Sequence, residues 1–306
     1  MRENKVIYGL IGYGGMGRWH TEILSNVPEI EIGGIYDIKE EKRIEAKEKG
    51  FSVYGSEEEM LSDPDIDVVL IATPNDCHKP IAIRAMHAGK NVISEKPVTL
   101  SSSDLQEMEN VAKETGKFLT VHQNRRWDDD FLIIRKLVEE QKLGHVFRIE
   151  SRVHGSRGIP GDWRKEKIHG GGMVLDWGVH LLDQILYLYG DRKIETVYAS
   201  LTHITNQEVD DGFTTILTFE GGTEVLVEVG TNNYISLPRW YVLGEDGTAV
   251  IRDWQLNGEI IRKTGITEEK VVPVKTAAGL TKTMAPRRYN RERRAATCVR
   301  RYCGFP

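Results

Sequence analysis

The chain has 306 residues, of which 28% are charged and 40% hydrophobic, and its formal net charge is −5. This length is enough for one large or two ordinary globular domains, and we expect two. The slightly negative charge gives no general attraction for nucleic acid, and no apolar run reaches the roughly 18 residues that a membrane helix needs. We therefore expect neither nucleic acid nor a membrane as a partner.

Residues 1–11, MRENKVIYGLI, lack the long apolar region and the small-residue cleavage site of a secretory signal. The cysteines are Cys77, Cys298 and Cys303, which form no disulfide framework. Both features favour a reducing, cytoplasmic location. Cys298 and Cys303 have no nearby histidine or second cysteine pair, so no metal site is assigned.

Residues 1–122 alternate short apolar runs with charged amphipathic segments. Near-continuous apolar strands that alternate with helices indicate a parallel sheet covered on both faces. The sequence thus predicts an α/β protein whose first domain, residues 1–122, is a doubly wound Rossmann sheet. The predicted strands are 5–11, 31–36, 67–72, 91–94 and 117–122, and the predicted helices are 15–26, 39–49, 79–89 and 102–115.

A glycine-rich turn, GYGGMG at 12–17, lies between the first strand and the first helix. Glycine-rich turns are common, but this position favours a dinucleotide site over a merely structural turn. Gly12 permits the tight turn, Gly14 lets pyrophosphate approach the backbone, and Gly17 permits close packing of the helix on the strand. The predicted cofactor contacts here are Gly12, Tyr13, Gly14, Gly15, Met16 and Gly17.

Asp37 lies twenty residues after Gly17, at the end of the second strand. A carboxylate there accepts hydrogen bonds from the ribose hydroxyls and repels a 2′-phosphate. Because neither Tyr36 nor Ile38 is basic, NAD is favoured over NADP. Three basic residues that weaken this preference follow nearby: Lys39, Lys42 and Arg43.

Polar residues follow the third and fourth strands at the carboxyl edge, where open α/β sheets bind ligands. Lys96 either serves a ligand there or forms a structural ion pair with Glu95, and Pro97 fixes the chain direction. The predicted cofactor contacts at this edge are Thr73, Pro74, Asn75, His78, Glu95 and Lys96.

After Trp127 the pattern changes to an α+β domain, residues 123–286, built on a large, mostly antiparallel open sheet. A helix is predicted at about 129–142 and another, led by glycines, from 172. Turns at 220–223, 245–248 and 256–258 mark successive hairpins. The predicted strands are 194–204, 213–220, 223–231, 239–245, 247–254, 259–265 and 269–274.

The final segment, residues 287–306, is atypical, with seven arginines, one acid and two of the three cysteines. It is either a basic tail for an anionic partner or a truncated or frame-shifted end, and the second explanation accounts for more. We expect this tail to bury little, to carry no site residue and to leave an apolar surface uncovered.

The segment GGGMVLDWGVHLLDQ, residues 170–184, places Asp176, His180 and Asp183 on one stripe of a helix. The stripe either faces water, or its Asp–His pair handles a proton while the glycines let a ligand approach. The residues alone leave both interpretations open.

Four motifs together resemble the Gfo/Idh/MocA oxidoreductases: GYGGMGRWH, ATPNDCH, AGKNVISEKPVTL and GGGMVLDWGVHLLDQ, in that family's order and spacing. The resemblance extends over residues 5–285. It implies a Rossmann domain, a C-terminal domain whose open sheet forms homodimers or homotetramers, and NAD(P)-dependent redox chemistry on sugars, cyclitols or their derivatives. The segment 122–131, HQNRRWDDDF, resembles a subgroup with some scyllo-inositol dehydrogenases, and we add its His122 and Asn124 to the cofactor contacts.

The same resemblance implies catalytic roles for Lys96, Asp176 and His180, and cofactor contacts for Trp163 and Arg164. His180 would take the proton of a secondary alcohol while hydride goes to the nicotinamide. Asp176 would orient the imidazole or bind a neighbouring hydroxyl, and Lys96 would hold the reacting oxygen. The glycines at 170–172 are expected to leave space for sugar and nicotinamide.

The leading hypothesis is an NAD-dependent sugar or cyclitol dehydrogenase that acts on a secondary hydroxyl, with a small-molecule sugar or polyol as its substrate. Its rivals are a non-catalytic sensor that binds dinucleotide or sugar, and a reductase or cofactor-retaining oxidoreductase. Retention of Lys96, Asp176 and His180 argues against the sensor. His20 is expected to pack structurally, and several side chains keep open roles in packing or in substrate recognition: Trp127, Trp163, Trp240, Arg125, Arg126, His154, Arg157 and Arg164.

Overall fold

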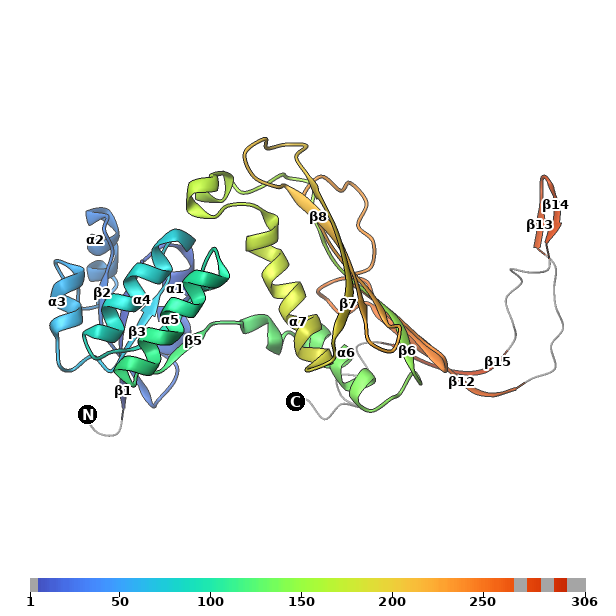
Figure 1. Cartoon of the computed structure of the whole chain (residues 1–306), viewed down its shortest axis with the longest axis horizontal. Coiled ribbons are helices and arrows are strands. Elements are labelled where there is room, and N and C mark those ends of the chain that lie inside the picture. The colour runs from blue at the N-terminus through green and yellow to red at the C-terminus, as the bar shows by residue number, and fades with distance from the viewer. Residues whose placement is uncertain (1–4, 267–273, 282–288, 296–306) are drawn as a thin grey trace. The chain divides into compact units, whose positions relative to one another are not determined.

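The computed structural model describes residues 5–266, 274–281 and 289–295. The chain divides into two compact units, each with its own sheet (Figure 1). None of the helices in the described ranges has the length and apolarity needed to cross a membrane. The first unit comprises Met1–Gln123, Ile159–Val179 and Asn206–Val209, and the second comprises Asn124–Gly158, His180–Thr205 and Asp210–Pro306.

The first unit contains a five-stranded sheet in the order β2-β1-β3-β4-β5, and all its pairings are parallel. The predicted Rossmann sheet is therefore confirmed. Its strands are β1 (Val6–Ile11), β2 (Ile30–Tyr36), β3 (Val68–Ile71), β4 (Asn91–Ser94) and β5 (Leu119–Val121).

Helices follow the strands of this sheet, and one of them was not predicted. The short helix α3 begins after Ser56, whose hydroxyl accepts a hydrogen bond from the Glu59 N–H. Three consecutive glutamates in its first turn suit a helix N-terminus, but six residues are too few to show a helical hydrophobic period. The helices are α1 (Gly15–Leu24), α2 (Glu40–Glu48), α3 (Glu57–Ser62), α4 (His78–His87) and α5 (Ser102–Thr115).

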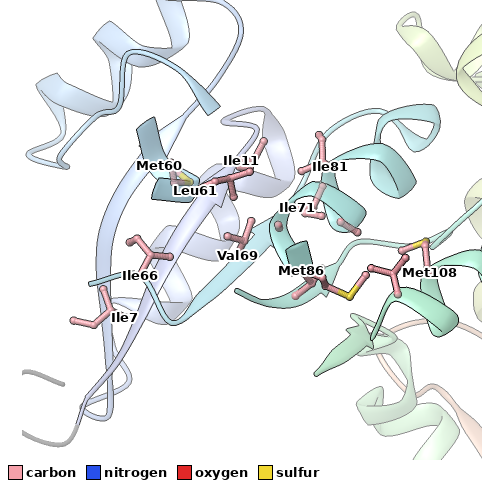
Figure 2. Packing of buried hydrophobic residues seen from close by; sticks show 14 residues of the cluster. Ile7, Ile11, Met60, Leu61, Ile66, Val69, Ile71, Ile81, Met86 and Met108 are labelled. Atoms are coloured by element: carbon pink, nitrogen blue, oxygen red, sulfur yellow. The ribbon is translucent and has the colours of Figure 1, made fainter. Parts of the chain in front are cut away.

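Strand β3 is buried along its whole length, with core on both faces of the sheet. Val69 and Ile71 pack in one cluster with Met86 of α4 and Met108 of α5 (Figure 2). Leu70, pointing the other way, packs in a second cluster. This two-sided packing fixes the position of the strand ends that carry the predicted site residues.

The second unit contains an eight-stranded sheet in the order β15-β12-β11-β10-β6-β9-β8-β7, antiparallel except for the pair β6 and β9. The three predicted hairpin turns join β8 to β9, β10 to β11 and β11 to β12. The strands are β6 (Val146–His154), β7 (Ile194–Thr202), β8 (Gly212–Phe219), β9 (Glu224–Gly230), β10 (Trp240–Gly244), β11 (Gly247–Ile251), β12 (Gly258–Ile266) and β15 (Tyr289–Ala295). A separate hairpin joins β13 (Val274–Thr276) to β14 (Gly279–Thr281).

Two helices pack against this sheet, α6 (Asp129–Glu139) and α7 (Val179–Tyr189). Phe131 of α6 lies 6.2 Å from Trp240 of β10, between ring centroids. Tyr189 of α7 stacks on Phe219 of β8, with the ring centroids 4.6 Å apart.

Strand β6 was missed although it lies inside the sheet. One of its faces carries charged side chains that pair with neighbouring charges: Arg148 contacts Glu224, and Arg152 contacts Glu150 and Glu228. These side chains can lie inside the sheet because their charges neutralise one another. Since the segment contains these charges, it lacks the apolar run that marks a buried strand.

The C-terminal tail contains one strand, at a place where the sequence predicted no helix or strand. Residues 289–295 form β15, which pairs antiparallel with β12. Arg293 is exposed, with its Nε 2.6 Å from Glu259 Oε2. The rest of the tail, with Cys298 and Cys303, and most of the predicted strand 269–274 lie outside the described residues.

Candidate cofactor and catalytic site

The glycine turn after β1 combines two crowded glycines with two open ones. A Cβ on Gly12, which has φ 98°, would lie 2.5 Å from the Ala72 carbonyl oxygen, and one on Gly17 would lie 2.1 Å from the Gly12 carbonyl oxygen. A Cβ on Gly14 or Gly15 would meet nothing within 4 Å, and no side chain caps α1. The N–H groups at the start of α1 therefore have no side-chain cap, and the space beside Gly14 and Gly15 is open.

Asp37 is held against this turn by backbone donors. The Tyr13 N–H donates to Asp37 Oδ2 at 2.6 Å, and the Lys39 N–H donates to Oδ1 at 2.9 Å. The Tyr13 ring is fully buried near Phe51, so this residue offers a ligand its backbone only. Arg43 donates to the Asp37 carbonyl oxygen at 2.6 Å and leaves the carboxylate unneutralised.

The loop after β3 is fixed by buried polar contacts. His78 is fully buried, with Nδ1 2.8 Å from the Pro97 carbonyl oxygen and Nε2 3.0 Å from that of Thr73. Burial lowers the pKa of His78, and the neutral ring donates to one of these carbonyls. His78 thus joins two loops at the sheet edge and has no exposed ring surface for a ligand. Thr73 and Pro74 are half-buried, and the buried Asn75 donates to the Gly170 carbonyl oxygen at 2.8 Å.

Glu95, directly after β4, is the centre of a buried cluster. Its Oε1 lies 2.7 Å from His20 Nε2 and 3.1 Å from His122 Nδ1, and its Oε2 accepts the Lys96 N–H at 3.2 Å. Burial by itself would raise the pKa of Glu95, but the hydrogen bonds from His122 and His20 lower it well below the usual range. The three ligand atoms lie within 4.8 Å of one another, close enough to share a metal ion, and the two separations at Oε1 are those of hydrogen bonds.

Lys96 extends to Asp176, which precedes α7 in the chain. Its Nζ donates to Asp176 Oδ1 and to the Asp176 carbonyl oxygen, both at 3.0 Å, and Arg164 Nε lies 3.2 Å from the same Oδ1. Burial would raise the pKa of Asp176, but Lys96 and Arg164 lower it. The Lys96 ammonium is thus held at this carboxylate, and an ammonium in such a place suits an oxygen that becomes negative during reaction.

Arg164 belongs to a short 3-10 helix, Trp163–Lys165, that is capped by Asp162. Its guanidinium lies over the Trp163 ring, 4.6 Å from the centroid, and donates to Asp162 Oδ2 at 2.7 Å. Trp163 thus packs on the guanidinium that contacts Asp176.

Gly170 and Gly171, which precede Asp176, are needed for packing, and this corrects the expectation that these two glycines leave open space. A Cβ on Gly170 would lie 2.3 Å from Leu100 Cδ2, and one on Gly171 would lie 2.3 Å from the Arg164 carbonyl oxygen. The segment Val174–Gly178 is a π-helix and not the regular α-helix that the spacing predicted. Such turns are frequent at functional sites.

His180 and Asn124 belong to the second unit. The His180 side chain is buried at 5% exposure, and Asn124 begins a short 3-10 helix. Asp183, the third member of the polar stripe, is bound by Arg126 Nε and Nη2 at 2.8 and 2.6 Å, so this carboxylate is structural.

Other open candidates acquire structural roles. Trp240 is fully buried and donates to Asp130 Oδ2 at 2.8 Å, so it is a core residue. His154 Nε2 lies 3.0 Å from Glu228 Oε1. His20 is buried, as expected. The sequence did not predict the contact between His169 Nδ1 and Asp76 Oδ1, at 3.1 Å, because no spacing signal joins residues so far apart.

Two family models match the chain. One, described as oxidoreductase family, NAD-binding Rossmann fold, matches residues 6–123, and the other, the GFO/IDH/MocA C-terminal domain, matches residues 131–250. Both matches agree with the two sheets described above.

Individual proteins are similar as well. The Escherichia coli uncharacterized oxidoreductase YdgJ is 37% identical over 190 residues, which are 61% of this chain and 55% of that protein. The Bacillus subtilis scyllo-inositol 2-dehydrogenase (NADP(+)) IolW is 30% identical over 244 residues, 79% of this chain and 67% of that protein. The crystal structure of an NAD-binding protein from Listeria innocua is 51% identical with a TM-score of 0.92, covering 96% of this chain and 84% of that one.

Proposed function

Because the chain belongs to the Gfo/Idh/MocA oxidoreductase family, we propose that it is an NAD-dependent dehydrogenase that oxidises a secondary hydroxyl of a sugar, a cyclitol or a related compound. The observation that carries this proposal is the Lys96 ammonium, 3.0 Å from the Asp176 carboxylate at the carboxyl edge of a Rossmann sheet. Ligands of such sheets bind at this edge.

The residues present fit a dinucleotide. The uncapped start of α1 and the open positions at Gly14 and Gly15 suit its pyrophosphate, and Asp37 suits its ribose. The Asp37 carboxylate opposes a 2′-phosphate, which is why we propose NAD. IolW is named for NADP(+), so the preference needs its own measurement.

The chemistry assigns one role to each polar group. When bound, NAD supplies the acceptor for the hydride. His180 takes the hydroxyl proton, since a neutral imidazole is a suitable base near pH 7. Lys96 donates a hydrogen bond to the hydroxyl oxygen and stabilises its negative charge, and Asp176 holds the Lys96 ammonium in place. Arg164 Nε contacts the same oxygen of Asp176 and further limits the freedom of this side chain.

A screen of polyols and sugars with NAD, followed by cofactor fluorescence, tests this proposal. A dehydrogenase produces NADH from free NAD with at least one polyol. Turnover that requires a second sugar as oxidant would indicate a cofactor-retaining enzyme, and binding without turnover would indicate a sensor. Either result would contradict the proposal.

We further propose that the chain assembles as a homodimer or homotetramer through its second unit. Strand β7 lies at one edge of the eight-stranded sheet and exposes Val197, Tyr198 and Leu201. Exposed apolar side chains on an edge strand favour association. Light scattering after size exclusion tests this, and a monomer at micromolar concentration would contradict it.

A further inference from the structure

The cluster around Glu95 contains two of the expected cofactor contacts, Glu95 and His122, and the proton and hydride transfer proposed above gives none of its side chains a role. His20 comes from α1, Glu95 follows β4 and His122 follows β5, so the cluster joins three separate elements of the first unit. His20 is 3% exposed and Glu95 is 5% exposed. A buried carboxylate loses its hydration, and hydrogen bonds must compensate the free energy that this loss costs.

The donors on this carboxylate are divided between its two oxygens. Two imidazole N–H groups share Oε1, and the backbone N–H of Lys96 donates to Oε2. The flanking backbone is fixed too, because the Glu95 N–H donates to the Ile71 carbonyl oxygen at 2.9 Å and the His122 N–H donates to the Ser94 carbonyl oxygen at 2.8 Å. The backbone hydrogen bonds between the strands end at Glu95. The Glu95 side chain adds one more hydrogen bond beyond them, to the N–H of Lys96.

We propose that His20, Glu95 and His122 form a positioning cluster that fixes the backbone of Lys96 and so keeps its ammonium on Asp176. The inference rests on the proposed function of Lys96. His20 lies three residues after Gly17 on α1, so the same cluster joins the helix that receives the cofactor to the residue that acts on the substrate. None of the three side chains needs to touch substrate for this role.

Glu95→Gln tests the proposal with little change in shape. A glutamine has one acceptor oxygen for the three N–H groups that share the carboxylate. We expect hydrogen exchange at the Lys96 amide to accelerate at least tenfold and kcat to fall at least tenfold. The control is Glu45→Gln, which removes a charge that pairs with Arg18 and Lys42 on the surface of the same unit and should change none of these quantities.

A second pair of variants separates positioning from simple loss of packing. His20→Gln keeps an N–H donor where Nε2 lies, and His20→Ala does not. We expect the glutamine variant to keep most of the exchange protection at Lys96 and the alanine variant to lose it. His87→Gln, at the exposed end of α4, is the control.

Unchanged exchange at Lys96 in Glu95→Gln would overturn the proposal, as would an unchanged kcat. Visible absorption bands on adding Co²⁺ to chelator-treated protein, lost in His122→Ala, would also overturn it, because the cluster would then bind a metal. If the unmodified protein oxidises no polyol, the proposed function fails, but the exchange measurement still decides whether Glu95 holds the Lys96 backbone.

Discussion

The carboxylate of Asp37 has a defined orientation, since each of its oxygens accepts a backbone N–H. Asp37→Ala should weaken NAD binding about tenfold to a hundredfold, the usual effect of losing a charged hydrogen-bond partner, and should weaken NADP binding much less. Titration calorimetry with both cofactors measures this, with Glu40→Ala at the exposed start of α2 as the control. Equal affinities for NAD and NADP in the unmodified protein would contradict the assignment.

Alanine substitutions at two glycines of the first turn should have different effects, one on the free energy of unfolding and the other on NAD binding. Gly17→Ala brings a Cβ onto the Gly12 carbonyl and should lower the free energy of unfolding by about 2–3 kcal/mol. Gly14→Ala meets no atom, so its effect on stability should stay below about 1 kcal/mol while NAD binds at least tenfold more weakly. Urea unfolding and calorimetry together test the pair. The interpretation fails if Gly14→Ala binds NAD normally.

The sequence predicted site residues that belong to local motifs, but it did not predict contacts between residues that lie far apart in the chain. The glycine spacing and Asp37 were accessible because they are local. The contact between Lys96 and Asp176, eighty positions apart, was not predicted, because the family resemblance implied only a separate catalytic role for each residue. No local pattern shows that Gly170 is needed for packing against Leu100, since that contact depends on the folded chain.

At the scale of elements, helix α6 carries a buried and a surface ion pair that can be compared. Asp130 lies 3.2 Å from Arg239 Nε and accepts the Trp240 N–H, and both charged side chains are buried. Asp130→Ala would leave a buried guanidinium without its carboxylate, so we expect a loss of about 3–5 kcal/mol in unfolding free energy.

Glu139→Ala, which removes the surface pair with Arg135 on the same helix, should cost at most about 0.5 kcal/mol. Urea unfolding followed by tryptophan fluorescence gives both values. Similar losses in the two variants would show that the buried pair contributes no more than the exposed one.

Elements were predicted well where apolar residues repeat with a clear period. The five strands of the first sheet and the hairpins of the second were found because their burial follows that pattern. Helix α3 is too short to show a period, and the paired charges of β6 hide its place inside the sheet. The strand β15 carries mostly arginine and other polar residues, which do not predict a strand.

At the scale of the whole molecule, acid should destabilise the fold. Several carboxyl groups have lowered pKa values in the folded chain: Glu95, Asp104, Glu150, Asp176, Asp211 and Glu228. Between their folded and unfolded pKa values the unfolded chain binds more protons, so their stabilisation is present above about pH 4–5 and is lost as the pH falls. Burial raises the pKa of Asp128, so the contribution of this one group to stability increases as the pH falls.

We expect the urea midpoint to fall steadily between pH 6 and pH 3.5, as followed by circular dichroism. High salt should reproduce little of this loss for the buried Glu95 and the partly buried Asp176, because screening acts mainly on exposed charges. A midpoint that stays constant or rises toward pH 3.5 would show that these carboxylates are not stabilised in the fold.

The most direct test of the account is the rate of NADH formation by Lys96→Ala with a polyol that the unmodified protein oxidises. The Lys96 ammonium contacts Asp176 and is assigned to the reacting oxygen, so kcat should fall at least about a hundredfold while the fold and most NAD affinity remain. Lys79→Ala, which removes a surface lysine paired with Asp104, should stay within twofold of the unmodified protein. A Lys96→Ala enzyme whose kcat stays within threefold would contradict the account.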